Sequence, residues 1–217
     1  MKKIVFDNPH RQKHFDFFNG MNHPHFSITS NVDVSRFLEQ SKSVGLPFSH
    51  SLIYCLSRTA NEIKEFRWRI RENTVIEHQT VHPSFTVSNE KSDVFSFCTV
   101  TFKNGINTFI AEAKKVQENM KSNPSLEDEP GRDDYLFLSA IPWVSFTSIQ
   151  HAMHFHPHDS VPRISWGKFF EQNGKILMPV SIQAHHALVD GRHMGAYFET
   201  LQNHLNSIQD EIKTTHS

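Results

Sequence analysis

Residues 180–193 read Val180-Ser-Ile-Gln-Ala-His-His-Ala-Leu-Val-Asp-Gly-Arg-His193. Small or apolar residues occupy every second position at the start of this segment, which is typical of a strand with one buried face. The same period places His186 on the apolar face and His185 on the opposite one. Asp190 and Gly191 favour a turn after the strand. Because histidine exchanges a proton readily near neutral pH, the segment predicts that His186 is a general base at a strand end.

A pair of adjacent histidines is weak evidence when taken alone, because a hydrogen-bonded histidine inside a core has the same appearance. The rest of the segment favours catalysis. An imidazole at the end of an apolar strand face, followed directly by Asp190-Gly191, is unusual for packing alone. His193 follows at helical spacing, and we expect it to be structural.

Strands and helices surround this segment without regular alternation. Apolar residues at helical spacing, together with capping and breaking residues, predict helices within Phe6–Gly20, Asp33–Gly45, Pro47–Ala60 and Gly105–Met120, and after Gly191. Alternating or β-branched stretches predict strands at Phe26–Ser30, Trp68–Ile70, Phe85–Val87, Val94–Thr101, Tyr135–Ser139, Val144–Thr147, Ile164–Phe170 and Ile176–Ala184. We expect Lys121–Asp134 to be an exposed loop. The pattern predicts an α+β fold with a mixed β-sheet, as a single domain over residues 1–217.

Composition excludes several classes of protein. The 22 Lys and Arg residues balance 23 Asp and Glu residues, so a nucleic-acid partner is not expected. No apolar run approaches the roughly 18 residues that a membrane-spanning helix needs, and no signal peptide is evident. We therefore expect a cytoplasmic protein. Cys55 and Cys98 are expected to be small core residues without a disulfide.

The chain is rich in phenylalanine, with 19 residues, and in histidine, with 16. Four of the histidines follow an HxxHxHxH spacing: His151, His154, His156 and His158. Imidazoles at such spacing suit Zn, Cu or Ni, so a metal-binding protein is one alternative. No cysteine or clear carboxylate completes a four-ligand site, so we expect no metal.

Several motifs together resemble one family. His185-His186-Ala-Leu-Val-Asp190-Gly191 is similar to the HHxxxDG signature that chloramphenicol acetyltransferases share with the acyltransferase cores of 2-oxo acid dehydrogenase complexes. Ser139-Ala-Ile-Pro-Trp-Val-Ser-Phe-Thr-Ser148 resembles the PWVSFTS stretch of chloramphenicol acetyltransferases, and Arg11-Gln-Lys-His-Phe-Asp-Phe-Phe18 resembles their RxxHFxxF segment. Val81–Val87 and Trp166–Phe169 also have counterparts. The resemblance implies a two-layer, CoA-dependent acyltransferase-like domain.

The resemblance also implies roles for five residues. His186 would remove the proton from the acceptor hydroxyl, which then attacks the thioester of acetyl-CoA directly. Ser139 would stabilise the oxyanion, and such a donor is typically worth about 10²–10³ in rate. Asp190 would pair with Arg11 to brace the site. Ser165, which stands where the family usually has threonine, would hold a water near the intermediate.

Ligand contacts and assembly follow from the same resemblance. Acetyl-CoA is the expected co-substrate, and the expected assembly is a homotrimer with His186 of one subunit facing the pocket of its neighbour. Each aromatic residue assigned to the acceptor could equally be core. The resemblance assigns Phe17, Phe18, Phe95 and Phe97 to the acceptor, and Trp143, Lys168 and Phe169 to CoA.

Two departures from the family concern the acceptor. Residues 149–162 differ from the usual stretch while keeping its length, and Phe18 replaces what is often a tyrosine. Chloramphenicol or another hydrophobic alcohol is therefore the expected acceptor. The rival assignments are an acyltransferase core of a 2-oxo acid dehydrogenase complex, for which we expect a lipoyl domain and linkers, and a family member that binds ligands without turnover.

Overall fold

The main feature of the computed structural model is a seven-stranded sheet in the order β2-β10-β8-β7-β5-β6, with β9 paired to β10. The structure describes all residues except 89–94, 123–128, 155, 158 and 214–217. The strands are β2 (His25–Asp33), β5 (His82–Ser88), β6 (Phe95–Thr99), β7 (Tyr135–Ile141), β8 (Arg163–Gly167), β9 (Phe170–Gln172) and β10 (Lys175–His185). Strand β7 runs parallel to β5 and β8, and the other pairs are antiparallel, which confirms the expected mixed sheet.

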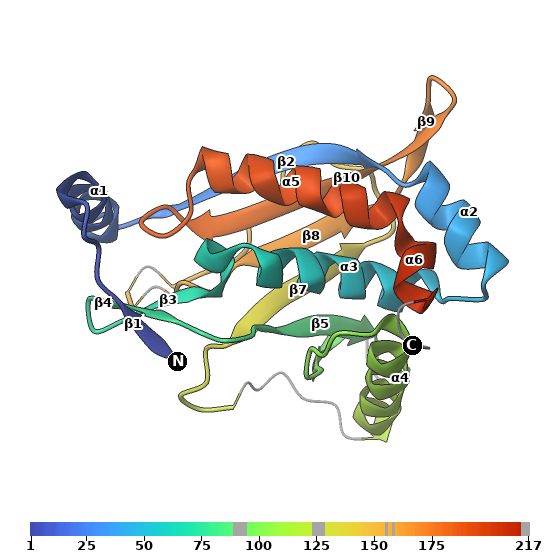
Figure 1. Ribbon diagram of the computed structural model, residues 1–217, viewed down its shortest axis with the longest axis horizontal. Coiled ribbons are helices and arrows are strands. Elements are labelled where there is room, and N and C mark those ends of the chain that lie inside the picture. The colour runs from blue at the N-terminus through green and yellow to red at the C-terminus, as the bar shows by residue number, and fades with distance from the viewer. Residues whose placement is uncertain (89–94, 123–128, 155, 158, 214–217) are drawn as a thin grey trace.

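Helices lie along one face of this sheet. Figure 1 shows α3 and α5 side by side across it, with α1 beyond the end at which β10 stops. The helices are α1 (Pro9–Asn19), α2 (Ser35–Ser43), α3 (Phe48–Glu62), α4 (Ile106–Ser122), α5 (Gly191–Asn206) and α6 (Ile208–Lys213), with a short 3₁₀ turn at Lys64–Arg67. The two layers confirm the α+β class. None of the described helices is long and apolar enough to cross a membrane.

A small second sheet, β1 (Lys2–Ile4), β4 (Thr74–Glu77) and β3 (Trp68–Arg71), is joined to the start of β7. Asp133 makes this connection, because it accepts hydrogen bonds from Arg71 Nε at 2.8 Å and from His78 Nε2 at 2.8 Å. These charged hydrogen bonds hold the pKa of Asp133 below its usual value, although burial acts in the opposite direction.

Strand register separates a core face from a polar face in the middle of the sheet. One row faces the helices and is buried in the core: Leu138, Ile164 and Ile182. The next row along the same strands consists of Ser139, Ser165 and Ser181. Because successive side chains on a strand point to opposite faces, this row of hydroxyls lies on the face away from α3 and α5.

Three secondary-structure expectations need correction. Val144–Thr147 is not a strand. The segment follows a turn after β7 and crosses the end of β8, where Lys168 N donates to Val144 O at 2.9 Å. Gly167 permits this crossing, because a Cβ there would stand only 2.9 Å from both Val144 O and the ring of Phe146. The expected strand Ile164–Phe170 is divided between β8 and β9. Strand β10 ends at His185, so His186 begins the following turn and strand alternation does not orient it.

The two cysteines and the acidic stretch were the remaining structural expectations. Cys55 and Cys98 are both buried and free, as predicted. The acidic stretch expected as a loop, Lys121–Asp134, lies partly outside the described residues.

Candidate active site

His186 is held between two phenylalanine rings. Its imidazole stacks on Phe18 of α1, with ring centroids 3.9 Å apart, and on Phe26 of β2, with centroids 4.2 Å apart. The backbone N–H of His186 donates to Pro24 O at 2.8 Å. Its Nδ1 atom is buried and has no hydrogen-bond partner among the described residues. Packing therefore fixes the ring plane, and Nε2, unlike Nδ1, is not buried without a partner.

Arg11 fastens α1 to the turn that carries His186. Its Nη2 donates to Leu188 O at 3.0 Å, and its Nη1 lies 3.0 Å from His14 Nδ1. The guanidinium also stands 4.6 Å above the ring of Phe6. Burial lowers the pKa of Arg11, against the opposing charge of Asp190. The N-terminal segment and the HHxxxDG turn are thus one structural unit.

Asp190 serves a different local role from the one expected. Its carboxylate caps α5 by accepting from the backbone N–H groups of Arg192, at 2.9 Å, and His193, at 3.3 Å. His193 Nδ1 in return accepts from Asp190 N at 3.0 Å, which completes a capping box. Within the described chain, no ion pair joins Asp190 to Arg11, because the helix terminus occupies the carboxylate and the Leu188 carbonyl occupies the guanidinium. Their charges interact only at longer range.

His185 is buried and lies edge-on to His25, with ring centroids 5.0 Å apart. Ala187 N donates weakly to His185 Nδ1 at 3.3 Å. The side chain is therefore part of the packing under the turn, in contrast to His186.

Ser139 belongs to a cavity of about 560 Å³ at the centre of the polar sheet face. Both phenylalanine rings and hydrogen-bonding groups line the cavity. The lining includes Phe95, Phe97, Phe137, Ser139, His151 and Arg163. Cavities of this size suit a drug-sized ligand. The Ser139 hydroxyl is half-buried and has no hydrogen-bond partner among the described residues.

Ser165 lies beside Ser139 across the β7–β8 pair and is fully buried. Its Oγ stands 2.8 Å from His151 Nε2, so a histidine occupies the hydroxyl that was expected to hold a water. Sequence reasoning considered His151 only as a possible metal ligand. The signal that could have placed it in the cavity of Ser139 is its position in the segment that departs from the family pattern.

The candidate site residues form two separate groups. From the strand register, Ser139 lies two strands from Ser181, and His186 lies five residues beyond Ser181 along the chain. At about 4.8 Å per strand and about 3.3 Å per residue, Ser139 and His186 are roughly 19 Å apart. Phe17, whose side chain is 64% exposed, and Phe18 accompany His186. Phe95 and Phe97 line the cavity of Ser139.

The residues assigned to CoA lie at the surface where β8 ends. Trp143 is 82% exposed and Phe169 is 45% exposed, and Lys168, which precedes Phe169, is exposed as well. The Phe169 ring also meets Phe48 edge-on, at 6.1 Å between centroids. Exposed aromatic rings beside a lysine suit a ligand that has both a base and phosphate groups.

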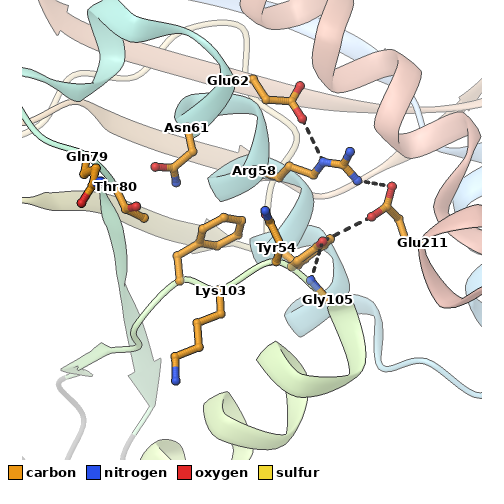
Figure 2. A pocket seen from close by; sticks show the side chains of 11 residues that line it. Tyr54, Arg58, Asn61, Glu62, Gln79, Thr80, Lys103, Gly105 and Glu211 are labelled. Carbon is orange, nitrogen blue, oxygen red and sulfur yellow. Dashed lines mark hydrogen bonds and ion pairs between the residues drawn. The ribbon is translucent and has the colours of Figure 1, made fainter. Parts of the chain in front are cut away.

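A second cavity of about 670 Å³ contains none of the candidate site residues. Figure 2 shows that Arg58, Glu62 and Glu211 are partnered to one another, while Lys103 lies apart from them. Arg58 bonds to Glu62 at 2.9 Å and pairs with Glu211, which also accepts from Tyr54 Oη at 3.3 Å. Mutual neutralisation of this kind is typical of a structural cluster.

The histidine-rich segment does not assemble a metal site within the part of the chain that the structure describes. No three His, Cys, Asp or Glu side chains are placed there to hold an ion. His151 is bonded to Ser165, and His156 lies 3.2 Å from Asn22 Oδ1. His158 lies outside the described residues.

Comparison with known proteins agrees with this geometry. The family model for chloramphenicol acetyltransferase matches residues 1–202. Chloramphenicol acetyltransferase 3 of Escherichia coli is 28% identical over 198 residues, which cover 91% of this chain and 93% of that protein. The enzyme of Bacillus pumilus is 29% identical over 203 residues, covering 93% and 92%. A solved chloramphenicol acetyltransferase covers 94% of this chain and 99% of its own, with a TM-score of 0.82 at 26% identity.

A more distant likeness extends to the cubic core of the pyruvate dehydrogenase complex, with a TM-score of 0.67 at 15% identity and coverage of 96% of this chain and 94% of that one. That identity supports a common fold alone, and the expected CoA-dependent acyltransferase-like domain is confirmed. From the family match over residues 1–202, the chain belongs to the chloramphenicol acetyltransferase family.

Proposed function

We propose that this protein transfers the acetyl group of acetyl-CoA to a hydroxyl of chloramphenicol or a similar hydrophobic alcohol, and so inactivates the antibiotic. The relatives at 28–29% identity over nine-tenths of the chain are named chloramphenicol acetyltransferases. The observation that supports the chemistry most is the stacked ring of His186, whose Nδ1 is buried while none of the described residues bonds to Nε2. A ring held in this way can present one nitrogen to a hydroxyl proton.

In the proposed reaction, His186 Nε2 takes the proton of the acceptor hydroxyl as its oxygen forms a bond to the acetyl carbon. Ser139 Oγ donates a hydrogen bond to the carbonyl oxygen while that oxygen is negatively charged. Such a donor acts mainly in the transition state, so it raises the rate more than it tightens binding. When the carbon–sulfur bond breaks, the His186 imidazolium returns its proton to the departing thiolate. No acetylated enzyme is formed.

The separation of about 19 Å between Ser139 and His186 supports a site assembled from two subunits. A base must lie within hydrogen-bond reach of the proton that it removes, directly or through one water. In this proposal, one subunit supplies His186 with Phe17 and Phe18, and its neighbour supplies Ser139 with Phe95 and Phe97. The expected homotrimer provides such contacts as a closed ring of identical interfaces.

The remaining candidate residues support the turn that carries His186 or contact CoA. Arg11 links α1 to the turn of His186 through Leu188 O, and Asp190 fixes the start of α5 behind it. Burial opposes ionisation of Asp190, but His193 and the backbone N–H groups outweigh it, so the pKa of Asp190 is lowered. We assign Trp143, Lys168 and Phe169 to CoA, because these exposed groups suit stacking and phosphate contacts.

The direct test mixes the purified protein with acetyl-CoA, chloramphenicol and a thiol reagent that reports free CoA. We expect CoA release that depends on chloramphenicol and that a chelator does not change. Loss of turnover with chelator would restore the metal-binding alternative. Dihydrolipoamide as the acceptor tests the other rival, the 2-oxo acid dehydrogenase core. Release with dihydrolipoamide and not with any alcohol would overturn the proposal.

A further inference from the structure

The acceptor cavity has one feature that its aromatic wall does not explain. Besides the phenylalanine rings, the lining includes an imidazole and a carboxylate from residues 149–162, those of His151 and Asp159. This is the segment in which the sequence departs from the family pattern. The Asp159 carboxylate is already paired with Arg163, but a purely hydrophobic acceptor would leave Nδ1 of His151 without a partner, at a cost of about 1–3 kcal/mol if it stays buried and unsatisfied.

His151 is fixed from two sides. Its Nε2 lies 2.8 Å from the buried Ser165 hydroxyl, and its backbone N–H donates to Gln183 Oε1 at 2.9 Å. Gln183 is itself buried and also reaches Met153 Sδ at 3.0 Å. The imidazole is therefore held in one orientation by the sheet, which is what a selective contact requires.

The surroundings of His151 favour the neutral form of its ring. Burial lowers its pKa, and the nearby positive charge of Arg163 lowers it further. Arg163 is in turn bound by Asp159 through contacts of 2.9 and 2.7 Å, so it is unavailable to the acceptor without loss of that pair. The polar wall therefore offers a neutral hydrogen-bonding group instead of a free charge.

One nitrogen of His151 remains available. Nε2 is occupied by Ser165, and Nδ1 has no hydrogen-bond partner among the described residues. A neutral imidazole has one donor and one acceptor nitrogen, so Nδ1 takes whichever role the Ser165 contact leaves to it. In either case it can bond a hydroxyl, which both donates and accepts.

We propose that His151 is a specificity-determining residue of the acceptor cavity, where its Nδ1 bonds a second polar group of an alcohol whose apolar body lies on Phe95, Phe97 and Phe137. This inference rests on the proposed acetyl transfer. It predicts that the protein prefers alcohols with a second hydroxyl over otherwise identical alcohols without one.

The test uses two acceptors that differ by a single group: phenylpropanol and the phenylpropanediol that carries one more hydroxyl. The kcat/KM ratio of diol to mono-alcohol is measured for the native protein and for two variants. His151→Asn keeps a polar atom near the position of Nδ1, and His151→Gln keeps one near Nε2. His154→Gln, in the same segment but exposed and outside the acceptor cavity, is the matched control.

We expect His151→Gln to lower the ratio about tenfold, which corresponds to one lost hydrogen bond of roughly 1.4 kcal/mol. His151→Asn should keep most of the preference, and His154→Gln should keep all of it. Equal ratios in the native protein and His151→Gln, or an equal loss in the Asn and Gln variants, would overturn the proposal. Binding of both alcohols by titration calorimetry without acetyl-CoA gives the same comparison if turnover fails, so failure of the inference is separable from failure of the proposed reaction.

Discussion

Mixing two inactive variants tests whether the active site forms between subunits. His186→Ala removes the base and Ser139→Ala removes the oxyanion donor, and each variant alone has every site damaged. Because the two residues lie roughly 19 Å apart in one chain, an intact site needs His186 from one copy and Ser139 from another. With random mixing, the subunit that supplies His186 is intact there in about half of the sites, and so is the subunit that supplies Ser139. Both residues are therefore present in about a quarter of the sites, and about a quarter of native activity returns.

The measurement is CoA release from chloramphenicol and acetyl-CoA, after the two variants are unfolded together and refolded as an equimolar mixture. The same variants refolded separately and then combined are the control, and they should stay near the activity of each variant alone. A dimer and a trimer give the same recovery, so gel filtration is needed to identify the trimer. If the co-refolded mixture shows no more activity than the control, Ser139 and His186 do not act together across an interface.

Three further changes test the local arguments. His186→Ala should lower kcat by about 10²–10⁴, as expected for a general base, while His185→Ala should retain more activity and chiefly lower the melting temperature; equal losses of activity would contradict this choice of base. Asp133→Asn should lower the free energy of unfolding by about 2 kcal/mol at pH 7, because charged hydrogen bonds to Arg71 and His78 are lost. Since the pKa of Asp133 is lowered in the folded state, its contribution is present above the unfolded pKa of about 3.9 and is lost as pH falls through the folded value, so urea midpoints of the two proteins should converge in acid. Gly167→Ala should cost about 1–3 kcal/mol in urea unfolding, because its Cβ would lie 2.8–2.9 Å from Pro179, Phe146 and the Val144 carbonyl; an unchanged midpoint would show that the segment can move aside at no cost.

Periodicity and breaker residues were sufficient to predict most of the architecture. The helices at Pro9–Asn19 and Phe48–Glu62 and the long strand before His186 follow directly from local patterns. Val144–Thr147 has the composition of a strand but is not one, because its partners are decided by the close approach at Gly167, which no local pattern records. Local patterns also do not show the residue at which strand β10 ends. His186 lies one residue beyond β10, so its orientation depends on contacts with Phe18 and Phe26. Both of these residues are far from it in the sequence.

The candidate site was only partly accessible to sequence reasoning, for a related physical reason. Motifs identify which residues carry chemistry, but they do not give distances between them. Arg11 and Asp190 were expected to pair, but Arg11 donates to the carbonyl of Leu188 and Asp190 accepts from the backbone N–H of Arg192. The bond from His151 to Ser165 connects a loop to a strand and depends on a register that becomes known only with the whole sheet.

The proposed division of the site between two subunits would also explain why two of the phenylalanines stay exposed. A chain that completes its site alone can bury its aromatic residues, but here Phe17 and Phe95 remain 64% and 49% exposed, one beside each half of the site. Leaving such rings in water is unfavourable by about 25 cal/mol per Å² of apolar surface, so the proposed contact between copies would be favoured at these rings. Association and catalysis would then depend on the same side chains. Phe17→Ser or Phe95→Ser should therefore lower the stability of the assembly and kcat together, and a variant that loses one without the other would separate the two roles.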